Sequence, residues 1–265
     1  MKKALNVILL LAAGLAFSGP VMAEDVTIVG TGSGAAVLKA VGEAFTLKNP
    51  GVTINVPESI GSGGGIKAVG RDEAKFGRIA RKIKPKEERF KLSYLPFCKM
   101  PICFFVNKSV EVKSLSTQQI CDIYSGKITD WKDVGGKSAK IRVIRREKGD
   151  SSLRVLLESF PGFADIKLTS KSKTTFSDPS TCELTQDKAN TIAFGTYINA
   201  KNYNVNIPLI NGKKPTDADW PYIGTLALIY KQKNYTGNIK KFAEFATSSE
   251  SHDAIKNMGG LPYQD

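Results

Sequence analysis

The stretch SIGSGGGIKAV, residues 59–69, joins a segment typical of a β-strand to a segment typical of a helix. The strand is expected at residues 52–56, and the helix is expected to begin among the glycines. Small residues let a ligand approach the backbone closely, and the first N–H groups of a helix have no partner within it. Because the helix dipole also favours negative charge at that end, the stretch predicts an anion site with the hydroxyl of Ser62 as a further donor.

The glycines do not fit the two common nucleotide motifs. No Gly-Lys-Ser/Thr sequence closes residues 59–69, as a P-loop requires, and GTGSG at residues 30–34 lacks the third glycine of a dinucleotide fingerprint. A flexible turn that contains a serine by chance is the alternative at this point.

A second loop of the same kind follows a strand expected at residues 140–144. Arg146 and the arginine before it begin the loop, and Asp150, Ser151 and Ser152 open the next helix. Free N–H groups, hydroxyls and a helix dipole again come together, and an arginine can bind a tetrahedral oxyanion through two parallel hydrogen bonds. In open α/β sheets such sites lie beyond the carboxyl ends of strands, so the two loops predict one ligand held between two lobes. The alternative is that the aspartate and the serines only cap a helix, while the arginines pair with surface carboxylates.

Segments typical of strands alternate with segments typical of helices, which predicts an α/β fold with largely parallel sheets. The mature chain of about 240 residues suffices for two ordinary domains or one large one. Strands are expected at residues 26–29, 52–56, 75–79, 101–107, 140–144, 191–198, 205–210 and 226–230, and helices at 35–48, after the glycine loop, at 116–126, 153–160 and 239–258.

The first 23 residues have the pattern of a secretory signal peptide: a basic start, an apolar stretch from Ala4 to Phe17, and small residues before the cleavage point. The mature chain is expected to begin near Glu24 and to lie in the periplasm. No later stretch reaches the ~18 apolar residues that a membrane span needs. No cysteine stands at the cleavage point, so a lipid anchor is not expected.

The chain carries 38 basic and 25 acidic residues, a net charge of +13. Such an excess attracts anions over long range when it is focused into a cleft, although a solvated surface is the ordinary explanation. Nucleic acid is not expected as a partner, because the chain is exported and shows no basic cluster interleaved with aromatic residues.

The chain has four cysteines, Cys98, Cys103, Cys121 and Cys182, and a compartment that permits disulfides. Three pairings are possible, and we favour Cys98 with Cys103 and Cys121 with Cys182. A single histidine, His252, gives little support to a metal site or to a Cys-His catalytic pair.

Six segments together make the sequence resemble a known family. They are IGSGGGIK at residues 60–67, residues 76–85 from FG to RKIKP, IYSGKITDW at 123–131, VIRR at 143–146, IAFGTY at 192–197 and LINGKKPT at 209–216. The sequence resembles the phosphate-binding proteins of bacterial ABC transporters over essentially the whole mature chain. The resemblance implies a two-lobed, type II clamshell fold with chain crossovers, in which residues 24–103 and 218–265 form one lobe and residues 104–217 the other.

The resemblance also implies the ligand-binding residues. The loop at residues 31–34 would contribute a hydroxyl or amides, the glycine loop would bind one side of the anion, and the loop at 149–152 would close the other side. Arg146 would supply the charge. The implied set is Ser33, Gly34, Ser62, Gly63, Arg146, Asp150, Ser151 and Ser152; no catalytic residue, metal or cofactor is implied.

Two positions depart from the family pattern. Where members of the family carry Ser-Asp, with the aspartate accepting the proton of hydrogen phosphate, this chain has Ala80 and Arg81. The second loop, usually Gly-Ser-Gly-Thr, here contains Asp150. We therefore expect Asp150 to accept the proton of the ligand, with Arg81 helping to hold it or the anion, and sulfate to be excluded because it brings no proton. Alternatively, Asp150 only caps its helix, Arg81 is an external charge, and another oxyanion is bound.

The expected function is capture of inorganic phosphate and its delivery, by a monomer, to an ABC permease in the inner membrane. The alternatives are the same fold binding a related oxyanion, or acting as a sensor or scavenger without a transporter. A hydrolase is disfavoured, because the sequence has no Gly-x-Ser-x-Gly elbow and no histidine near either loop serine.

Overall fold

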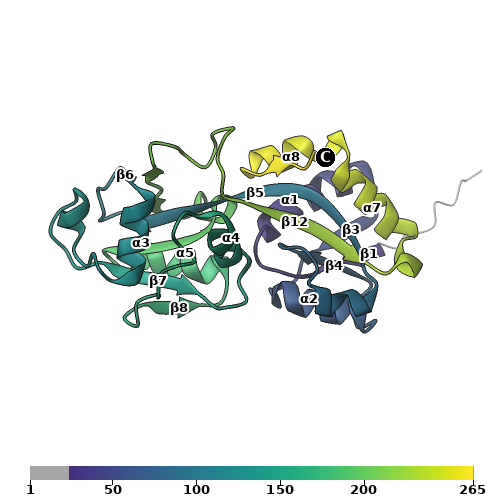
Figure 1. Ribbon diagram of the computed structural model, residues 1–265. Coiled ribbons are helices and arrows are strands. Elements are labelled where there is room, and N and C mark those ends of the chain that lie inside the picture. The colour runs from purple at the N-terminus through teal and green to yellow at the C-terminus, as the bar shows by residue number, and fades with distance from the viewer. Residues whose placement is uncertain (1–23, 265) are drawn as a thin grey trace, which may run out of the picture.

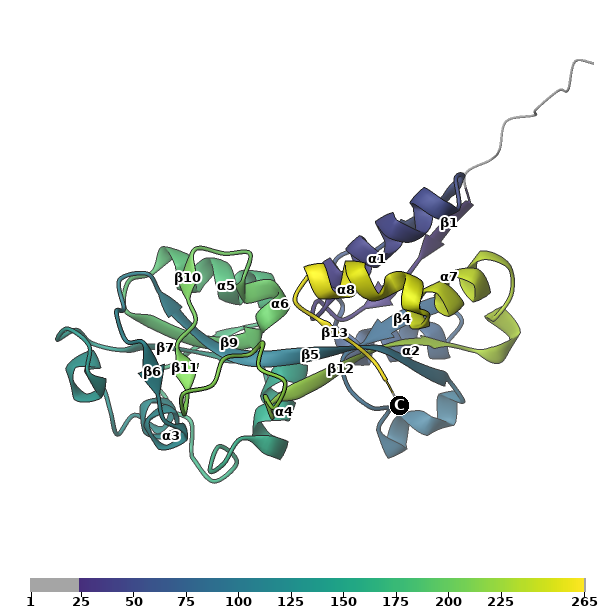
Figure 2. The same cartoon turned by 90° about the horizontal axis from the view of Figure 1, so that it is seen from above.

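The computed structural model describes residues 24–264, which form two lobes joined by long strands (Figure 1). The view from above shows the same two bodies side by side, and the predicted two-lobed α/β fold is confirmed (Figure 2). The predicted signal peptide lies outside the described residues. Within residues 24–264, no helix combines the length and the apolar character needed to cross a membrane.

Two strands, β5 (Ser93–Asn107) and β12 (Ile223–Tyr230), tie the lobes together. At ~3.3 Å per residue, β5 runs roughly 46 Å, which is long enough to cross both lobes. Its first part pairs with β12 and its second part with β9 (Thr191–Thr196). One nine-stranded sheet therefore passes through the whole molecule in the order β2-β4-β12-β5-β9-β7-β8, with β10 and β13 also paired to β5.

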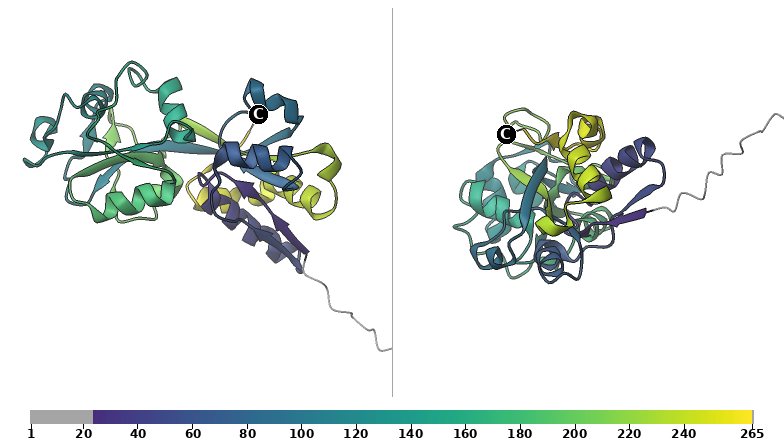
Figure 3. Two further views of the ribbon diagram at one scale, coloured as in Figure 1. Left: turned by 90° about the horizontal axis from the view of Figure 1, so that it is seen from below. Right: turned by 90° about the vertical axis from the view of Figure 1, so that its right-hand side faces the viewer.

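The first lobe, at the right of Figure 1, contains both the first and the last residues that the structure describes (Figure 3). Its further elements are β1 (Glu24–Thr27), β2 (Val29–Gly30), α1 (Ala35–Lys48), β3 (Val52–Asn55), α2 (Gly61–Gly70), β4 (Phe76–Ile79), α7 (Gly237–Thr247), α8 (His252–Asn257) and β13 (Leu261–Pro262).

The second lobe is built on the other half of the sheet. Its further elements are β6 (Ser114–Leu115), α3 (Thr117–Ser125), β7 (Arg142–Arg146), α4 (Ser151–Ser159), β8 (Lys173–Thr175), α5 (Asp178–Asp187), α6 (Tyr197–Ala200), β10 (Val205–Asn206) and β11 (Leu209–Ile210).

The capping residues of helix α3 explain where this helix begins and ends. The Ser116 hydroxyl accepts a hydrogen bond from the Gln119 N–H at 3.1 Å, and the Gln119 side chain accepts one from the Ser116 N–H at 2.8 Å. This capping box fixes the start of the helix, and Gly126, with φ of 82°, ends it in the left-handed region. The predicted helix is confirmed.

Each lobe has its own apolar core. The core of the second lobe surrounds Phe104 of β5, whose ring centroid lies 5.2 Å from that of Phe160 and 5.6 Å from that of Tyr124. Trp220 and Tyr222 pack into this same core. The predicted lobe boundaries stay a prediction, and this packing favours a return crossing slightly later than residue 218.

The prediction of largely parallel sheets is wrong, because the sheet is mixed. β12 runs antiparallel to both β4 and β5, and β5 runs antiparallel to β9, whereas β7 is parallel to β8 and β9. The predicted strand at 101–107 is only the second half of β5; Pro96 and Lys99 interrupt the apolar pattern of its first half. The predicted helix at 239–258 is two helices, since the chain turns between α7 and α8.

The favoured disulfide pairing is also wrong: all four cysteines are buried free thiols. Cys98 and Cys103 lie five residues apart on one extended strand, roughly 16 Å, whereas a disulfide needs Cα atoms within about 7 Å. Cys121 belongs to the core around Phe104, and Cys182 packs with Cys103 in a separate cluster.

Candidate functional site

Four helices of the two lobes begin around one small cavity. Helices α1 and α2 belong to the first lobe, and α4 and α5 to the second. The cavity has a volume of about 30 Å³ and is lined by Thr31, Gly32, Ser33, Ser59, Gly61, Ser62, Arg146, Glu147, Gly149, Asp150, Ser151, Phe176, Ser177 and Asp178. Four helix N-termini aimed at one space create a positive field there, which favours an anion.

The first lobe provides hydroxyl groups. The buried Ser62 accepts a hydrogen bond from the Ala80 N–H at 3.1 Å, which leaves its own proton free to donate. Ser33 lies in the loop before α1, where its N–H donates to the Thr31 hydroxyl at 3.2 Å. Ser62 is therefore held by a backbone N–H group and Ser33 by the Thr31 hydroxyl, as a preorganised site requires.

The fully buried Arg78 holds the two loops of this lobe. Its Nε donates to the carbonyl of Thr31 at 2.7 Å and its Nη2 to that of Pro57 at 2.6 Å, while Nη1 donates to the carbonyl of Ile28. Burial lowers the pKa of Arg78 to about 10, so it stays charged at neutral pH. Arg78 thus acts as a support behind the cavity.

Two glycines of the loops serve packing within the first lobe. A Cβ at Gly65 would lie 2.9 Å from the Cα of Gly30, and a Cβ at Gly30 would lie 1.9 Å from the carbonyl oxygen of Arg78. Helix α2 can therefore approach the sheet only because these positions have no side chain. The glycines of residues 59–69 are expected to let a ligand come close to the backbone, whereas Gly65, with Gly30, lets a helix come close to a strand.

In the second lobe, Arg146 ends β7 and points its charge at three carboxylates. Its Nη2 lies 2.9 Å from Asp150 Oδ2, its Nε lies 3.3 Å from Glu147 Oε2, and its Nη1 pairs with Asp178 Oδ1. Burial alone would lower the pKa of Arg146, but Asp178, Asp150 and Glu147 together raise it. A guanidinium with three acidic neighbours does not by itself attract a further anion.

The raised pKa of Asp150 reduces this excess of negative charge. Its Oδ1 accepts a hydrogen bond from the Leu153 N–H at 2.7 Å, so the side chain caps α4 as well as pairing with Arg146. Burial raises its pKa to about 7, although Arg146 works in the opposite direction. Asp150 can therefore hold or release a proton near neutral pH, and each proton that it holds removes one negative charge from the cavity.

Asp178, by contrast, is fixed by hydrogen bonds from several donors. Its Oδ2 accepts from the Thr196 hydroxyl and from the Asn199 amide, both at 2.9 Å. With Arg146 bound to the other oxygen, this carboxylate positions the guanidinium against the sheet.

The two lobes touch at the cavity. Ser33 Oγ and Ser151 Oγ, 118 residues apart in the chain, lie 3.1 Å from one another. The exposed Phe176 covers part of the rim, with 75% of its surface accessible.

The structure brings together Ser33, Ser62, Arg146, Asp150 and Ser151 of the predicted site. Gly34 and Gly63 do not line the cavity; they stand at the start of α1 and in the first turn of α2. Arg81 does not line it either, and the expected contact with Asp150 is replaced by one with Glu87. Two guanidinium nitrogens of Arg81 lie 2.7 and 2.8 Å from the Glu87 oxygens.

Ser152 takes a different position from its neighbours. It lies in the first turn of α4, is not one of the lining residues and is fully buried. Within residues 24–264, its hydroxyl is the one buried side-chain polar atom without a hydrogen-bond partner. An unpaired buried hydroxyl costs about 1–3 kcal/mol, so an acceptor brought by a ligand would be favourable here.

Asp178 is the main residue that the sequence analysis missed, together with the helix α5 that carries it. The polar sequence DPSTCELTQD hides the helical pattern. A start signal was nevertheless present, because Ser177 caps the helix by accepting from the Ser180 N–H and proline follows in the first turn.

Comparison with known proteins shows to which superfamily the chain belongs. A model of the PBP superfamily domain matches residues 18–250. The chain belongs to the PBP superfamily. Its similarity to phosphate-binding members of the superfamily, predicted from the six segments, is confirmed by individual relatives.

Two relatives and one solved structure illustrate this similarity. Phosphate-binding protein PstS of Bacillus subtilis is 23% identical over 91% of this chain and 81% of its own length. Phosphate-binding protein PstS 2 of Streptococcus pneumoniae is 29% identical over 42% of this chain, and the match spans only 37% of its length. The crystal structure of a Clostridium perfringens protein, described as a phosphate ABC transporter substrate-binding protein with bound phosphate, is 28% identical, with a TM-score of 0.80 over 91% of this chain and all of that chain.

Proposed function

We propose that the protein binds inorganic phosphate between its two lobes and delivers it to an ABC permease. The observation that carries the proposal is the convergence of four helix starts, Arg146 and a protonatable Asp150 on one cavity between the lobes. The relatives are named as phosphate-binding proteins, and the Clostridium perfringens structure contains phosphate. The proposal includes a periplasmic location, a monomeric state and no chemical transformation of the ligand.

The proposed ligand contacts come from both lobes. Ser33 and Ser62 donate their hydroxyl protons from the first lobe, and Ser151 and the first-turn N–H groups of α4 donate from the second. Ser152 gains an acceptor for its buried hydroxyl. Arg81 has no part in this proposal, because Glu87 occupies its guanidinium.

Asp150 gives the site its selectivity. When ionised, it accepts the proton that hydrogen phosphate still carries at neutral pH, whereas sulfate has no proton to offer. Two facing oxyanions without a proton between them repel one another, so the ionised carboxylate excludes sulfate.

Binding is coupled to movement of the lobes about β5 and β12. Ligand contacts from both lobes stabilise the closed arrangement, which the permease then recognises.

Calorimetry of the mature chain, after partial unfolding and dialysis to remove carried ligand, tests the proposal. We expect 1:1 binding of phosphate and of arsenate, which shares its protonation, and far weaker binding of sulfate and molybdate at about pH 9, where Asp150 is ionised. The absence of phosphate binding, or stronger binding of sulfate at neutral pH, would refute the proposal.

A further inference from the structure

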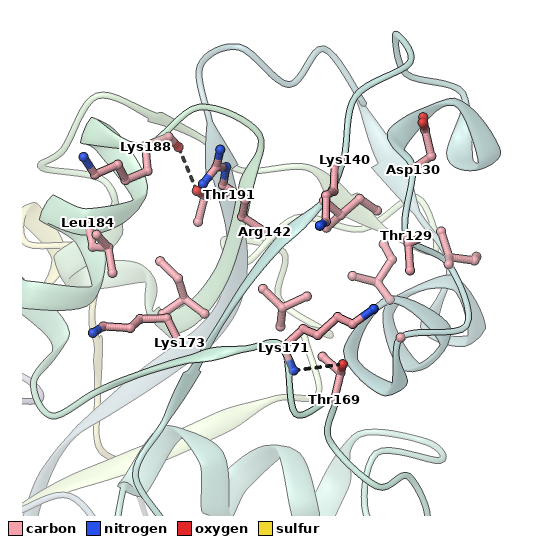
Figure 4. A pocket seen from close by; sticks show the side chains of 16 residues that line it. Thr129, Asp130, Lys140, Arg142, Thr169, Lys171, Lys173, Leu184, Lys188 and Thr191 are labelled. Carbon is pink, nitrogen blue, oxygen red and sulfur yellow. Dashed lines mark hydrogen bonds between the residues drawn. The ribbon is translucent and has the colours of Figure 1, made fainter.

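The second lobe contains another, larger cavity at the far end of its sheet. Its volume is about 730 Å³, within the usual range of small-molecule sites. It lies between the end of α3, the start of β7, the turn before β8 and the end of α5 (Figure 4). The cavity exists because β8 begins late: its first residue, Lys173, pairs with Ile144, which leaves the first two residues of β7 without a neighbour on that side.

This cavity is separate from the site between the lobes. β7, β8 and β9 run parallel, with their amino ends at the large cavity and their carboxyl ends toward the small one. Arg142 and Arg146, at opposite ends of β7, are about 13 Å apart along the strand. Arg142 lines the first cavity and Arg146 the second.

The rim of the large cavity is strongly basic. Five exposed cations stand around it, and Figure 4 shows them on several sides of the opening: Lys140, Arg142, Lys171, Lys173 and Lys188. Within the described residues 24–264, none of the five forms an ion pair with a carboxylate.

One carboxylate, Asp130, lines the same cavity but is already occupied. Its oxygens accept hydrogen bonds from the N–H groups of Lys132 and Ala139 and from the Ser138 hydroxyl, at 2.9 to 3.1 Å. The backbone N–H of Lys132, followed by the other donors, lowers its pKa, so it stays ionised as a local cap. The rim thus keeps a positive excess that a bound anion would neutralise.

The floor of the cavity is aliphatic. It consists of residues of two cores that meet at the open edge of β7: Ile123, Ile128, Ile141 and Val143 pack with the core around Phe104, and Ile144 and Leu184 pack with Cys103 and Cys182. Ile128 and Leu184 are half-buried, and the other four are buried. An aliphatic surface under a ring of cations matches a molecule with an apolar body and an anionic head. Inorganic anions would leave the floor unused, and neutral apolar molecules would leave the cations unused.

We propose that this cavity binds a small organic anion with an apolar body. The hydrocarbon or aromatic part lies on the aliphatic floor, and the carboxylate, sulfonate or phosphate head lies between the lysines of the rim. The proposal is independent of phosphate binding between the lobes.

Fluorescence titration with 8-anilinonaphthalene-1-sulfonate, an aromatic anion, tests it. The mature protein is kept in excess inorganic phosphate, so that the site between the lobes is saturated. We expect saturable binding that weakens about tenfold in Lys171→Gln/Lys173→Gln, since two charges near the head are removed. The matched control is Lys39→Gln/Lys256→Gln, which removes two exposed lysines of the first lobe and should leave the titration unchanged.

Two further measurements separate charge from apolar contact. The uncharged probe N-phenyl-1-naphthylamine should bind equally to the wild-type protein and to the Lys171→Gln/Lys173→Gln protein. Leu184→Trp, which fills the floor at a half-buried position, should weaken both probes, with thermal unfolding used to verify that the protein is folded. Equal binding of the sulfonate to both lysine double variants would overturn the proposal.

Discussion

Replacing Asp150 with asparagine should remove the ability of the protein to tell phosphate from sulfate. Asparagine has nearly the same shape and can still accept the Leu153 N–H, so the cap of α4 is kept. What changes is the charge beside Arg146 and the capacity to accept a proton from the ligand. The substitution therefore isolates the role of the carboxylate.

The size of the effect follows from the position of Asp150. Asp150 lines a cavity of only about 30 Å³, so an oxyanion bound in that cavity comes within about 4 Å of the carboxylate. Two like charges at that distance repel by about 4 kcal/mol at an effective dielectric constant near 20, a factor of roughly a thousand in affinity. Because a protonated Asp150 does not repel sulfate, Asp150→Asn should strengthen sulfate binding by about twofold at pH 7 and by about a hundredfold at pH 9, where the wild-type carboxyl is ionised. It should also weaken phosphate binding by about tenfold or more through the lost proton acceptor.

The pH dependence provides a second test of the same reasoning. Burial places the pKa of Asp150 at about 7, and sulfate requires the protonated carboxyl. The affinity of the wild-type protein for sulfate should therefore be constant below about pH 7 and fall by about tenfold per pH unit above it. The affinity of Asp150→Asn for sulfate should not change over this range.

Isothermal titration calorimetry between about pH 6 and pH 9, in two buffers of different ionisation enthalpy, measures both affinity and proton uptake. Asp165→Asn, an exposed aspartate of the same lobe, is the matched control and should behave as the wild type. If Asp150→Asn still discriminates against sulfate as the wild type does, Asp150 is only a helix cap and the proposed selectivity is wrong.

Four other substitutions or conditions test the remaining contacts. Ser152→Ala should leave the stability of the free protein unchanged or higher, since it removes an unpaired buried hydroxyl, yet weaken phosphate binding about tenfold in calorimetry; unchanged affinity would show that Ser152 does not meet the ligand. Arg146→Gln leaves two buried carboxylates unpaired and should cost about 3–5 kcal/mol in urea unfolding, whereas Arg142→Gln at the exposed end of the same strand should cost little. Arg81→Gln should change phosphate affinity by less than about threefold, because Glu87 already holds Arg81 away from the cavity. A larger loss of phosphate affinity would show that Arg81 contributes to the site. Finally, the unfolded chain releases the Asp150 proton near pH 4, whereas the folded protein keeps it up to about pH 7. Between these pH values the free energy of unfolding of the unliganded wild type should fall by up to about 4 kcal/mol relative to Asp150→Asn in urea titrations. Parallel curves for the two proteins would contradict the raised pKa.

The residues that line the cavity can be predicted from the sequence where a polar residue type and a helix-start signal occur at the same position. Ser62, Asp150 and Ser151 stand at helix starts that follow strands, and such positions are visible as patterns of glycine, serine and aspartate. Arg146 was placed in a loop but is the last residue of β7, because the apolar alternation ends before the hydrogen bonding does. These errors of one or two residues did not affect which side chains meet.

Other features depended on tertiary contacts that no local pattern records. The occupation of Arg81 by Glu87 requires the turn through Pro85, and the role of Asp178 requires α5 to begin beside β7. The same holds for the cysteines: an even number in an exported chain predicts bridges, but Cys98 and Cys103 lie on one extended strand. The prediction rested on an expected compartment and on spacing, whereas the directions of the side chains cannot be read from the sequence.

The hydroxyl contact between Ser33 and Ser151 bears on how fast the protein can capture its solute. The contact joins the two lobes at the edge of the cavity that both of them line, and so narrows the way in for a ligand. The two lobes must separate before the ligand can enter. The observed association rate should therefore level off at high ligand concentration, at the rate at which the two lobes open. The positive charge of the protein surface can then raise the rate at which the anion meets the protein without raising the rate at which it enters the cavity.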